Sequence, residues 1–150
     1  MSKNPRTPEV EFEFRHRQPV QIRFNDIDIF GHLNNSVYLQ FMDLGKAEYF
    51  RNLLPDGRFD PMEVGLVVAN INCDFYSPTK MEEQLEVLTA VSSISNKSLI
   101  LEQRVVNSAS GDVKCRALSV MVSFDPRTGA SEAISEEWRK RIAGFEQREI

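Results

Sequence analysis

The chain has 150 residues, enough for one domain with a core that needs neither disulfides nor a metal to be stable. It carries 18 Lys and Arg against 22 Asp and Glu, and this net charge of −4 argues against a general nucleic-acid binder. A hydrophobic fraction of 41%, without an apolar run long enough to cross a bilayer, is typical of a globular protein that has no membrane span.

The N-terminal region is predicted to hold a loose tail followed by two short strands. Residues 1–8 are polar and contain two prolines, which predicts the tail. Residues 10–14 and residues 20–24 each alternate apolar with polar or charged side chains, which indicates strands, and residues 15–19 between them indicate a turn.

A long helix is predicted from residue 36 to residue 53, after a loop of turn-forming residues and before a Pro-Asp-Gly stop signal. Most of its side chains are large and apolar, so most of its circumference must be covered, and a curved sheet would cover it. At the helical spacing, five polar or small positions fall within one arc of about 80°: Ser36, Gln40, Asp43, Ala47 and Arg51.

Four alternating runs downstream of this helix are predicted to form such a sheet. Residues 66–75 present apolar side chains at every second position, and similar alternation follows in residues 85–91, 99–105 and 113–124. Short turn-like connections join the last three runs, which favours antiparallel hairpins over a parallel sheet with crossover helices.

The C-terminal region is predicted to form a second helix that packs on the body of the domain. Ser135 is suited to cap its N-terminus, and Trp138, Ile142 and Phe145 would form an apolar stripe. Gly144 is expected just beyond its end. These elements place the chain in the α+β class, as a single domain over residues 1–150.

Cys73 and Cys115 lie far apart in the sequence, each in an apolar alternating run. This placement favours two buried thiols in a reducing compartment over a disulfide scaffold. Since residues 1–15 contain no apolar segment typical of a signal peptide, we expect a cytoplasmic protein.

Several common catalytic and metal-binding motifs are absent from the sequence, including a Gly-rich phosphate loop, a Gly-x-Ser-x-Gly elbow and a His-Glu-x-x-His pair. The spacing of Asp26 and Asp28 is faintly similar to a calcium loop, but Phe30 and Val37 stand where such a loop needs oxygen ligands. We therefore expect no metal and no cofactor. His16 lies between two arginines and is expected to be solvated.

The loop before the long helix is the remaining candidate site, because it carries two carboxylates and leads directly into a helix N-terminus. Unpaired N–H groups at that end can polarise a carbonyl oxygen. A nearby carboxylate can activate water or attack an acyl carbon. This is a minimal hydrolase arrangement without serine or cysteine; on spacing alone, an aspartate that only caps the loop is the favoured interpretation.

Residues 23–38 (RFNDIDIFGHLNNSVY) resemble the signature of the hotdog-fold acyl-CoA thioesterases of the hydroxybenzoyl-CoA thioesterase-like family, and within it most closely the long-chain acyl-CoA branch. The resemblance continues through residues 75–78 (FYSP) and covers residues 18–145. It implies a long central helix wrapped by an antiparallel sheet of five or six strands. It also implies hydrolysis of a thioester to a carboxylate and free CoA, at sites shared between the two subunits of a dimer.

By position, the resemblance implies that Asp28 is the catalytic carboxylate, acting either as a general base or as a nucleophile through an anhydride. The backbone N–H of Asn35 would polarise the thioester carbonyl. His32 is assigned a hydrogen bond with the substrate or with Asp28; a loop histidine bound to the backbone is the alternative. Asp26 is expected to hold the loop.

Four further residues are candidates for substrate binding, and each could instead have a purely structural role or face solvent. Asn34 could serve only as a helix cap, and Tyr38 could belong to the core. Asn70 and Asn72 are polar positions in the run 66–75, and could reach the site of the partner subunit or face solvent.

Two other functions remain compatible with the sequence. One is a dehydratase or hydratase that acts on enoyl or hydroxyacyl thioesters, with Asp28 and His32 as an acid–base pair. The other is a non-catalytic module that binds acyl thioesters. The expected partner is an acyl-CoA or acyl carrier protein thioester, so that CoA is part of the substrate and not a cofactor. The sequence leaves open the acyl group, the choice between these carriers, and a homodimer against a homotetramer.

Overall fold

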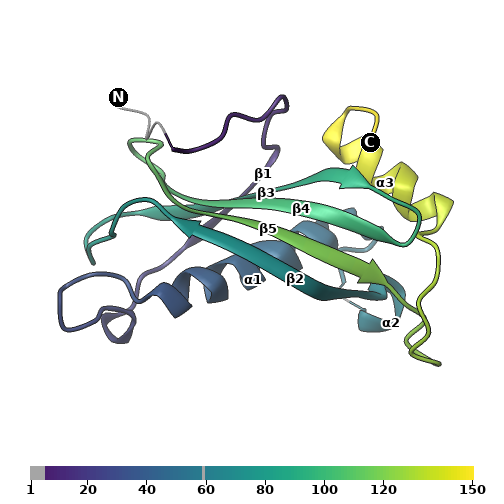
Figure 1. Cartoon of the computed structure of the whole chain (residues 1–150), viewed down its shortest axis with the longest axis horizontal. Helices are drawn as coiled ribbons and strands as arrows, with labels where there is room; N and C mark the ends of the chain where they lie inside the picture. The colour runs from purple at the N-terminus through teal and green to yellow at the C-terminus, as the bar shows by residue number, and fades with distance from the viewer. Residues whose placement is uncertain (1–5, 59) are drawn as a thin grey trace.

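Within residues 6–58 and 60–150, which the computed structural model describes, one long helix lies against a five-stranded antiparallel sheet (Figure 1). This is the α+β architecture expected from the sequence. In chain order the elements are β1 (His16–Val20), the 3-10 helix η1 (Phe24–Asp26), α1 (Asn35–Leu53), α2 (Pro61–Val64), β2 (Leu66–Phe75), β3 (Leu85–Ile94), β4 (Ser98–Asn107), β5 (Val113–Ser123) and α3 (Glu136–Glu146). The strands lie in the order β1-β3-β4-β5-β2, so β1 and β2 form the two edges.

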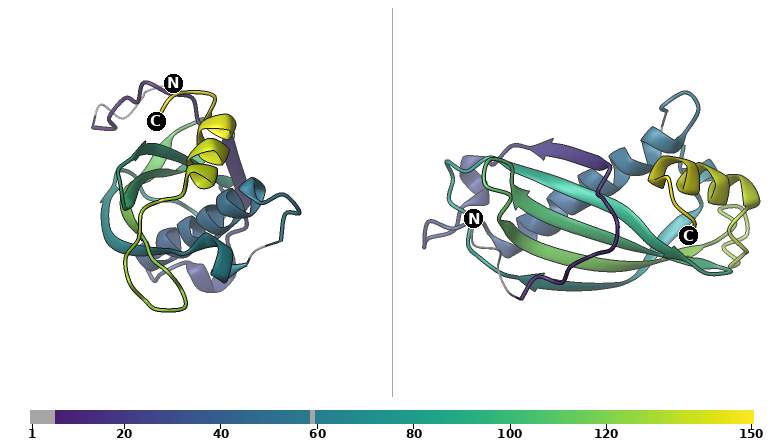
Figure 2. Two further views of the ribbon diagram at one scale, coloured as in Figure 1. Left: turned by 90° about the vertical axis from the view of Figure 1, so that its right-hand side faces the viewer. Right: turned by 90° about the horizontal axis from the view of Figure 1, so that it is seen from above.

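The sheet curves around α1, as the end-on view in Figure 2 shows, and this curvature explains the composition of the helix. Most of its large apolar side chains, among them Val37, Phe41 and Phe50, are buried against the sheet and α3. The narrow stripe predicted to stay in contact with water is exposed at all five of its positions. The periodicity of the helix therefore predicted correctly both its length and its environment.

A glycine in the middle of α1 allows the helix to approach the sheet closely. A Cβ atom on Gly45 would lie 2.7 Å from Val87 Cγ1, so no larger residue fits without a shift. Beside it, the buried Gln103 side chain donates to the Met42 carbonyl at 2.8 Å and to Thr89 Oγ1 at 3.0 Å. These contacts pin the centre of α1 to β3 and β4.

The N-terminal predictions were wrong. Residues 10–14 form no strand, and β1 occupies the segment predicted as a turn, because residues 16–20 pair with β3 from His16 opposite Thr89 to Val20 opposite Leu85. Long-range pairing outweighs the local turn signal, and an edge strand tolerates Pro19. His16 is not solvated: its ring packs edge-on against Tyr49, with centroids 5.7 Å apart.

The segment before β1 crosses the face of the sheet opposite α1, here called the outer face (Figure 2). The Arg104 guanidinium lies over the ring of Phe14, 5.5 Å from its centroid, and donates to the Pro8 carbonyl at 2.6 Å. Of the predicted loose tail, residues 1–5 lie outside the described residues, whereas Pro8 is held by this contact.

β2 departs from its predicted pattern. A bulge between Val68 and Asn70 shifts the register, so Val67 and Ile71 point to opposite faces although both belong to one alternating series. As an edge strand, β2 also leaves Val67, Ile71 and Phe75 exposed. The predicted continuous apolar face is therefore neither continuous nor covered within this chain.

The remaining predictions about helices and cysteines are mostly confirmed. Ser135 caps α3 by accepting from the Trp138 amide at 3.2 Å, but the helix runs past Gly144 to Glu146, with Gln147 as its C-cap residue at φ 54°. Cys115 is buried and Cys73 half-buried; both are free, with sulfurs 3.2 Å apart on neighbouring strands. No helix among the described residues is long and apolar enough to span a bilayer.

Candidate active site

The loop between η1 and α1 lies at one end of the molecule, where α1 begins (Figure 1). Short main-chain bonds fold it back on itself: the Asn34 amide donates to the Asp26 carbonyl at 2.8 Å, and Ile27 and Leu33 form an isolated antiparallel bridge. We call residues 25–34 the motif loop. Its two aspartates have different environments.

Asp26 is buried and paired with Arg23. Its carboxylate accepts from the Arg23 amide at 2.8 Å and from the Arg23 guanidinium at 2.9 Å. The hydrogen bond from the Arg23 side chain outweighs the effect of burial and lowers the pKa of Asp26. Asp26 therefore stays ionised and anchors the start of the motif loop.

Asp28 is half-buried, and only one of its carboxylate oxygens is used within the loop. Oδ1 accepts from the amides of Phe30 at 2.9 Å and His32 at 3.2 Å. Oδ2 accepts no hydrogen bond from any residue that the structure describes. The loop thus orients this carboxylate and leaves one oxygen available to water or to a substrate.

The start of α1 offers unpaired amides close in sequence to that carboxylate. Asn34 is the N-cap residue, with an extended backbone, but its side chain makes no capping hydrogen bond. The backbone N–H groups of Asn35 and Ser36 lie in the first turn, where an α-helix supplies no acceptor, and both residues are exposed. These amides can donate to an incoming carbonyl oxygen.

A shallow hollow of about 380 Å³ opens beside this helix end. Its lining includes Arg23, Asn34, Ser36 and Gln40, but not Asp28. It therefore reaches Asn34 and Ser36 at the helix start, but neither Asn35 nor Asp28 lines it. Among the residues that the structure describes, no three His, Cys, Asp or Glu side chains gather as metal ligands would.

The other predicted site residues differ in their relation to the motif loop. His32 is half-buried within it; its amide and carbonyl bind Asp28, and its imidazole makes no hydrogen bond with a described residue. Tyr38 is buried one turn into α1, where its hydroxyl lies 2.8 Å from Thr79 Oγ1 and its ring meets Phe75 edge-on. Burial raises the pKa of Tyr38.

Asn70 and Asn72 lie apart from the motif loop of their own chain. They stand opposite Val120 and Leu118 on β5, which alternate with the buried residues that face α1. Directly opposed residues share a face of the sheet, so both asparagines point to the outer face. A contact between them and a substrate at Asp28 would therefore need the motif loop of a second subunit.

One residue at the motif loop was not anticipated. Thr79 is fully buried in the connection after β2; its carbonyl accepts from the Leu33 amide at 2.8 Å, and its hydroxyl pairs with Tyr38. The only hint in the sequence was that the resemblance to the thioesterase family continues through the adjoining residues 75–78.

Comparison with known proteins gives consistent results. The family described as the thioesterase-like superfamily matches residues 22–142. The long-chain acyl-CoA thioesterase FadM of Escherichia coli K12 is 25% identical over 123 residues, 82% of this chain and 93% of that protein. The acyl-CoA thioester hydrolase YbgC of E. coli O6:H1 is 27% identical over 111 residues, 73% of this chain and 82% of its own length.

Solved structures share the fold. A thioesterase of Thermus thermophilus, crystallised with coenzyme A and Zn, is 30% identical with a TM-score of 0.81, covering 91% of this chain and 98% of that one. The probable thioesterase YbaW of E. coli is 24% identical with a TM-score of 0.72, covering 87% and 98%. Both likenesses extend over most of the chain.

Proposed function

The chain belongs to the thioesterase-like superfamily, and on this premise we propose that it hydrolyses an acyl-CoA thioester to a carboxylate and free CoA. The observation that carries the proposal is the pairing of an oriented carboxylate, whose Oδ2 is free, with the unpaired amides that begin α1. The chemistry of thioester hydrolysis requires both: a group that delivers an oxygen to the acyl carbon, and donors for the oxygen that becomes negative.

In the proposed reaction the thioester carbonyl accepts a hydrogen bond from the backbone N–H of Asn35. Asp28 either removes a proton from an attacking water or attacks the acyl carbon itself, forming an anhydride that water then opens. In the first route the proton that Asp28 takes from water passes to the sulfur, and CoA leaves as the thiol. In the second route CoA leaves as the thiolate and takes up a proton from water. We assign His32, in the same loop, a hydrogen bond with the substrate.

CoA is the proposed carrier, in preference to acyl carrier protein, since FadM and YbgC are named for acyl-CoA substrates and the Thermus thioesterase was crystallised with coenzyme A. Within this chain Tyr38 is sealed in the core, so its proposed contribution is to the wall behind the site and not to direct contact with the thioester.

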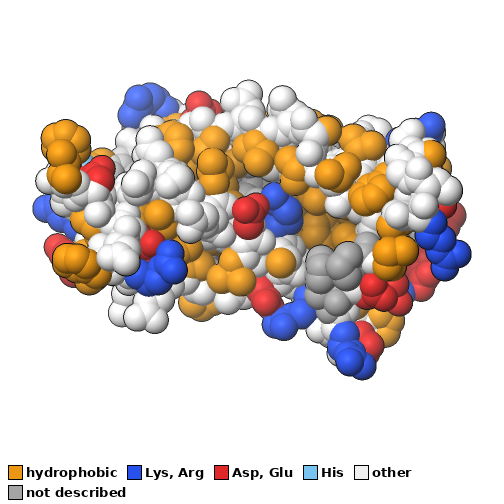
Figure 3. All heavy atoms as spheres, turned by 90° about the horizontal axis from the view of Figure 1, so that it is seen from below, with side chains coloured by type: hydrophobic (Ala, Val, Ile, Leu, Met, Phe, Trp, Pro, Cys, Tyr) orange, Lys and Arg blue, Asp and Glu red, His pale blue; other side chains and the backbone are white. Residues whose placement is uncertain are grey.

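We further propose that two copies of the chain form a dimer through β2. The free edge of β2 leaves a row of main-chain groups unpaired, and such an edge invites pairing with another strand. Seen from below in Figure 3, hydrophobic side chains are exposed along much of the molecule. The exposed apolar residues include Ile71 and Phe75 on this strand, and Phe24, Ile29 and Phe30 at the motif loop.

Release of free thiol from a panel of short, long and aromatic acyl-CoAs tests the proposed function. We expect hydrolysis well above the spontaneous rate for at least one class. Consumption of an enoyl-CoA without thiol release would instead support the dehydratase or hydratase, and tight binding without turnover would support a non-catalytic module. Either result would overturn the thioesterase proposal.

A further inference from the structure

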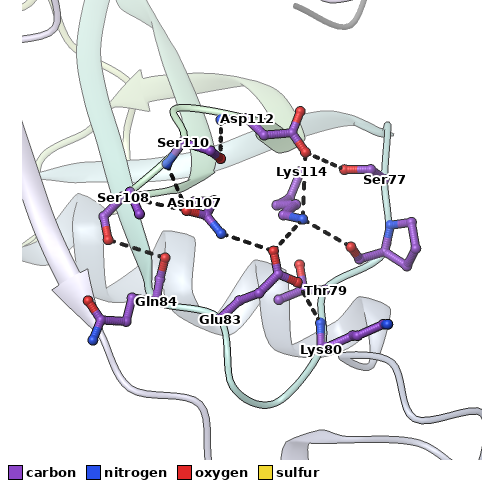
Figure 4. A network of polar contacts seen from close by, with 12 residues as sticks. Ser77, Thr79, Lys80, Glu83, Gln84, Asn107, Ser108, Ser110, Asp112 and Lys114 are labelled. Carbon is purple, nitrogen blue, oxygen red and sulfur yellow. Dashed lines mark hydrogen bonds and ion pairs between the residues drawn. The ribbon is translucent and has the colours of Figure 1, made fainter. Parts of the chain in front are cut away.

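Lys114 is a buried lysine at the start of β5, beside the connection that follows β2 (Figure 4). Only 7% of its side chain is exposed. The ammonium lies 2.7 Å from Glu83 Oε1 and 3.6 Å from Asp112 Oδ2, and it donates to the Pro78 carbonyl at 3.1 Å. A buried ammonium is costly unless acceptors surround it, and here three acceptors do so.

The carboxylates around Lys114 are themselves fixed, as the dashed lines in Figure 4 show. Glu83 also accepts from the Lys80 amide at 2.7 Å and from the Asn107 side chain at 3.0 Å, and Asp112 accepts from the Ser77 hydroxyl at 3.1 Å. Burial opposes the charge of Glu83, but these bonds outweigh it and lower the pKa of that group. The cluster therefore clamps residues 77–83 to the β4–β5 hairpin.

The connection formed by residues 77–83, which this cluster holds in place, contacts both the motif loop and α1. Thr79 follows Pro78 directly; its carbonyl binds the Leu33 amide, and its hydroxyl binds Tyr38 of α1. Leu33 stands between His32, which is bonded to Asp28, and Asn34, the N-cap of α1. Two successive carbonyls, those of Pro78 and Thr79, thus link Lys114 to the point where the motif loop passes into the helix.

We propose that Lys114 is a positioning residue for the reaction, which acts through Pro78 and Thr79 to fix Leu33 and so the spacing between the Asp28 carboxylate and the Asn35 amide. This inference rests on the proposed function, since those two groups are the reacting ones. Spacing matters because displacing a reacting group by about 1 Å can slow an enzyme roughly a hundredfold.

Arg116 offers a matched control on the same strand. It too pairs with a buried carboxylate, with Nε 2.7 Å from Glu102 Oε1, but on the outer face, and it donates to no residue of the 77–83 connection. Replacing Arg116 by methionine removes its ion pair with Glu102, which keeps Arg104, whereas replacing Lys114 removes its ion pairs with Glu83 and Asp112. Only the Lys114 replacement also releases Pro78.

The experiment compares Lys114→Met and Arg116→Met with the wild type by hydrogen–deuterium exchange of the peptide 27–37, by kcat and KM for thiol release, and by thermal unfolding. For Lys114→Met we expect exchange in this peptide to rise by at least roughly tenfold. We expect kcat to fall roughly ten- to hundredfold, with a smaller change in KM. Arg116→Met should leave both near wild type.

Unchanged exchange in Lys114→Met, or an equal effect of Arg116→Met at a similar loss of Tm, would overturn the inference. Thr79→Val and Tyr38→Phe cover the case in which Lys114→Met does not fold, because each removes one hydroxyl and keeps its shape. Each single variant should speed hydrogen–deuterium exchange of the peptide 27–37, and the double variant should exchange little faster than either single variant. The inference is also overturned if the single variants have no effect, or if their effects add fully in the double variant. A wild-type protein without thiol release would refute the proposed function alone, since exchange needs no substrate.

Discussion

Asp28 and His32 are joined by two hydrogen bonds: the Asp28 amide donates to the His32 carbonyl at 2.8 Å, and the His32 amide donates to the Asp28 side chain, at Oδ1, at 3.2 Å. An asparagine side chain keeps an oxygen that accepts these bonds and loses the charge. Asp28→Asn is therefore expected to lower kcat at least roughly a hundredfold, with Tm close to wild type. Thiol-release kinetics and thermal unfolding measure the two effects. Undiminished kcat in the folded variant would remove Asp28 from the mechanism.

The neighbouring carboxylate is expected to affect stability and its dependence on pH. The pKa of Asp26 is lowered in the folded protein, chiefly by its hydrogen bond with Arg23, from about 3.9 in the unfolded chain. The ionised group therefore adds stability above that value, and the contribution is lost as pH falls through the lower folded pKa. Asp26→Asn should reduce the free energy of unfolding at neutral pH and flatten its decline below about pH 5. Urea titrations across this pH range measure the free energy of unfolding. If its dependence on pH is the same in Asp26→Asn as in the wild type, the stabilising role of the Asp26 carboxylate is contradicted.

His16 should weaken the fold in mild acid. Burial lowers its pKa, against a smaller opposing effect of Glu48, and its buried Nδ1 has no hydrogen-bond partner within residues 6–58 and 60–150. Stability from the neutral imidazole is therefore present above about pH 6.5 and is lost as pH falls, because the unfolded chain takes up the proton more readily. His16→Phe keeps a ring against Tyr49 and should make the free energy of unfolding less sensitive to pH between about 7 and 5. The same slope in variant and wild type would show that His16 is not responsible.

Two glycines in helices should respond oppositely to alanine. At Gly45 the new Cβ meets Val87 at 2.7 Å, so Gly45→Ala should destabilise the protein by about 1–3 kcal/mol. At Gly144 in α3 nothing lies within 4 Å, so Gly144→Ala should stabilise by up to about 1 kcal/mol through helix propensity. Chemical denaturation of both variants measures the pair, and a neutral Gly45→Ala would mean that α1 does not pack closely on β3.

A charge on the free edge should break the proposed dimer. Ile71 on β2 is 44% exposed, and Leu44 on α1 is 43% exposed, so the two residues form a matched pair for substitution. We expect Ile71→Glu to shift the protein from dimer to monomer in light scattering, and Leu44→Glu to leave it dimeric. A monomeric wild type at micromolar concentration would refute dimerisation through β2.

The elements built on local periodicity could be predicted from the sequence. The pattern predicts the start of α1 within one residue, at Ser36 instead of Asn35, and β3, β4 and β5 occupy the alternating runs. The alternation of residues 10–14 indicates a strand, but Phe12 and Phe14 instead pack beneath the guanidinium groups of Arg148 and Arg104. The bulge in β2 could not be predicted from the alternation either, because one inserted residue moves every later side chain to the opposite face of the strand.

The candidate site could be located only in part. Its loop is continuous in sequence, so the carboxylates, the Gly-His step and the helix start could be seen together. Thr79 contacts that loop from a distant part of the chain, and Lys114 contacts Pro78 beside it, in an arrangement that depends on how β2 and β5 pair. No spacing in the sequence encodes such a contact.

The segment before β1 has a consequence for higher assembly. It lies over Arg104, whose guanidinium, with that of Arg116, holds the buried carboxylate of Glu102. The outer faces of two sheets therefore cannot pack directly against each other while this segment stays in place. A second sheet would have to displace the segment and would then contact the charged groups of Arg104, Arg116 and Glu102. We therefore expect that two dimers, if they join into a tetramer, do so without packing their sheets back to back.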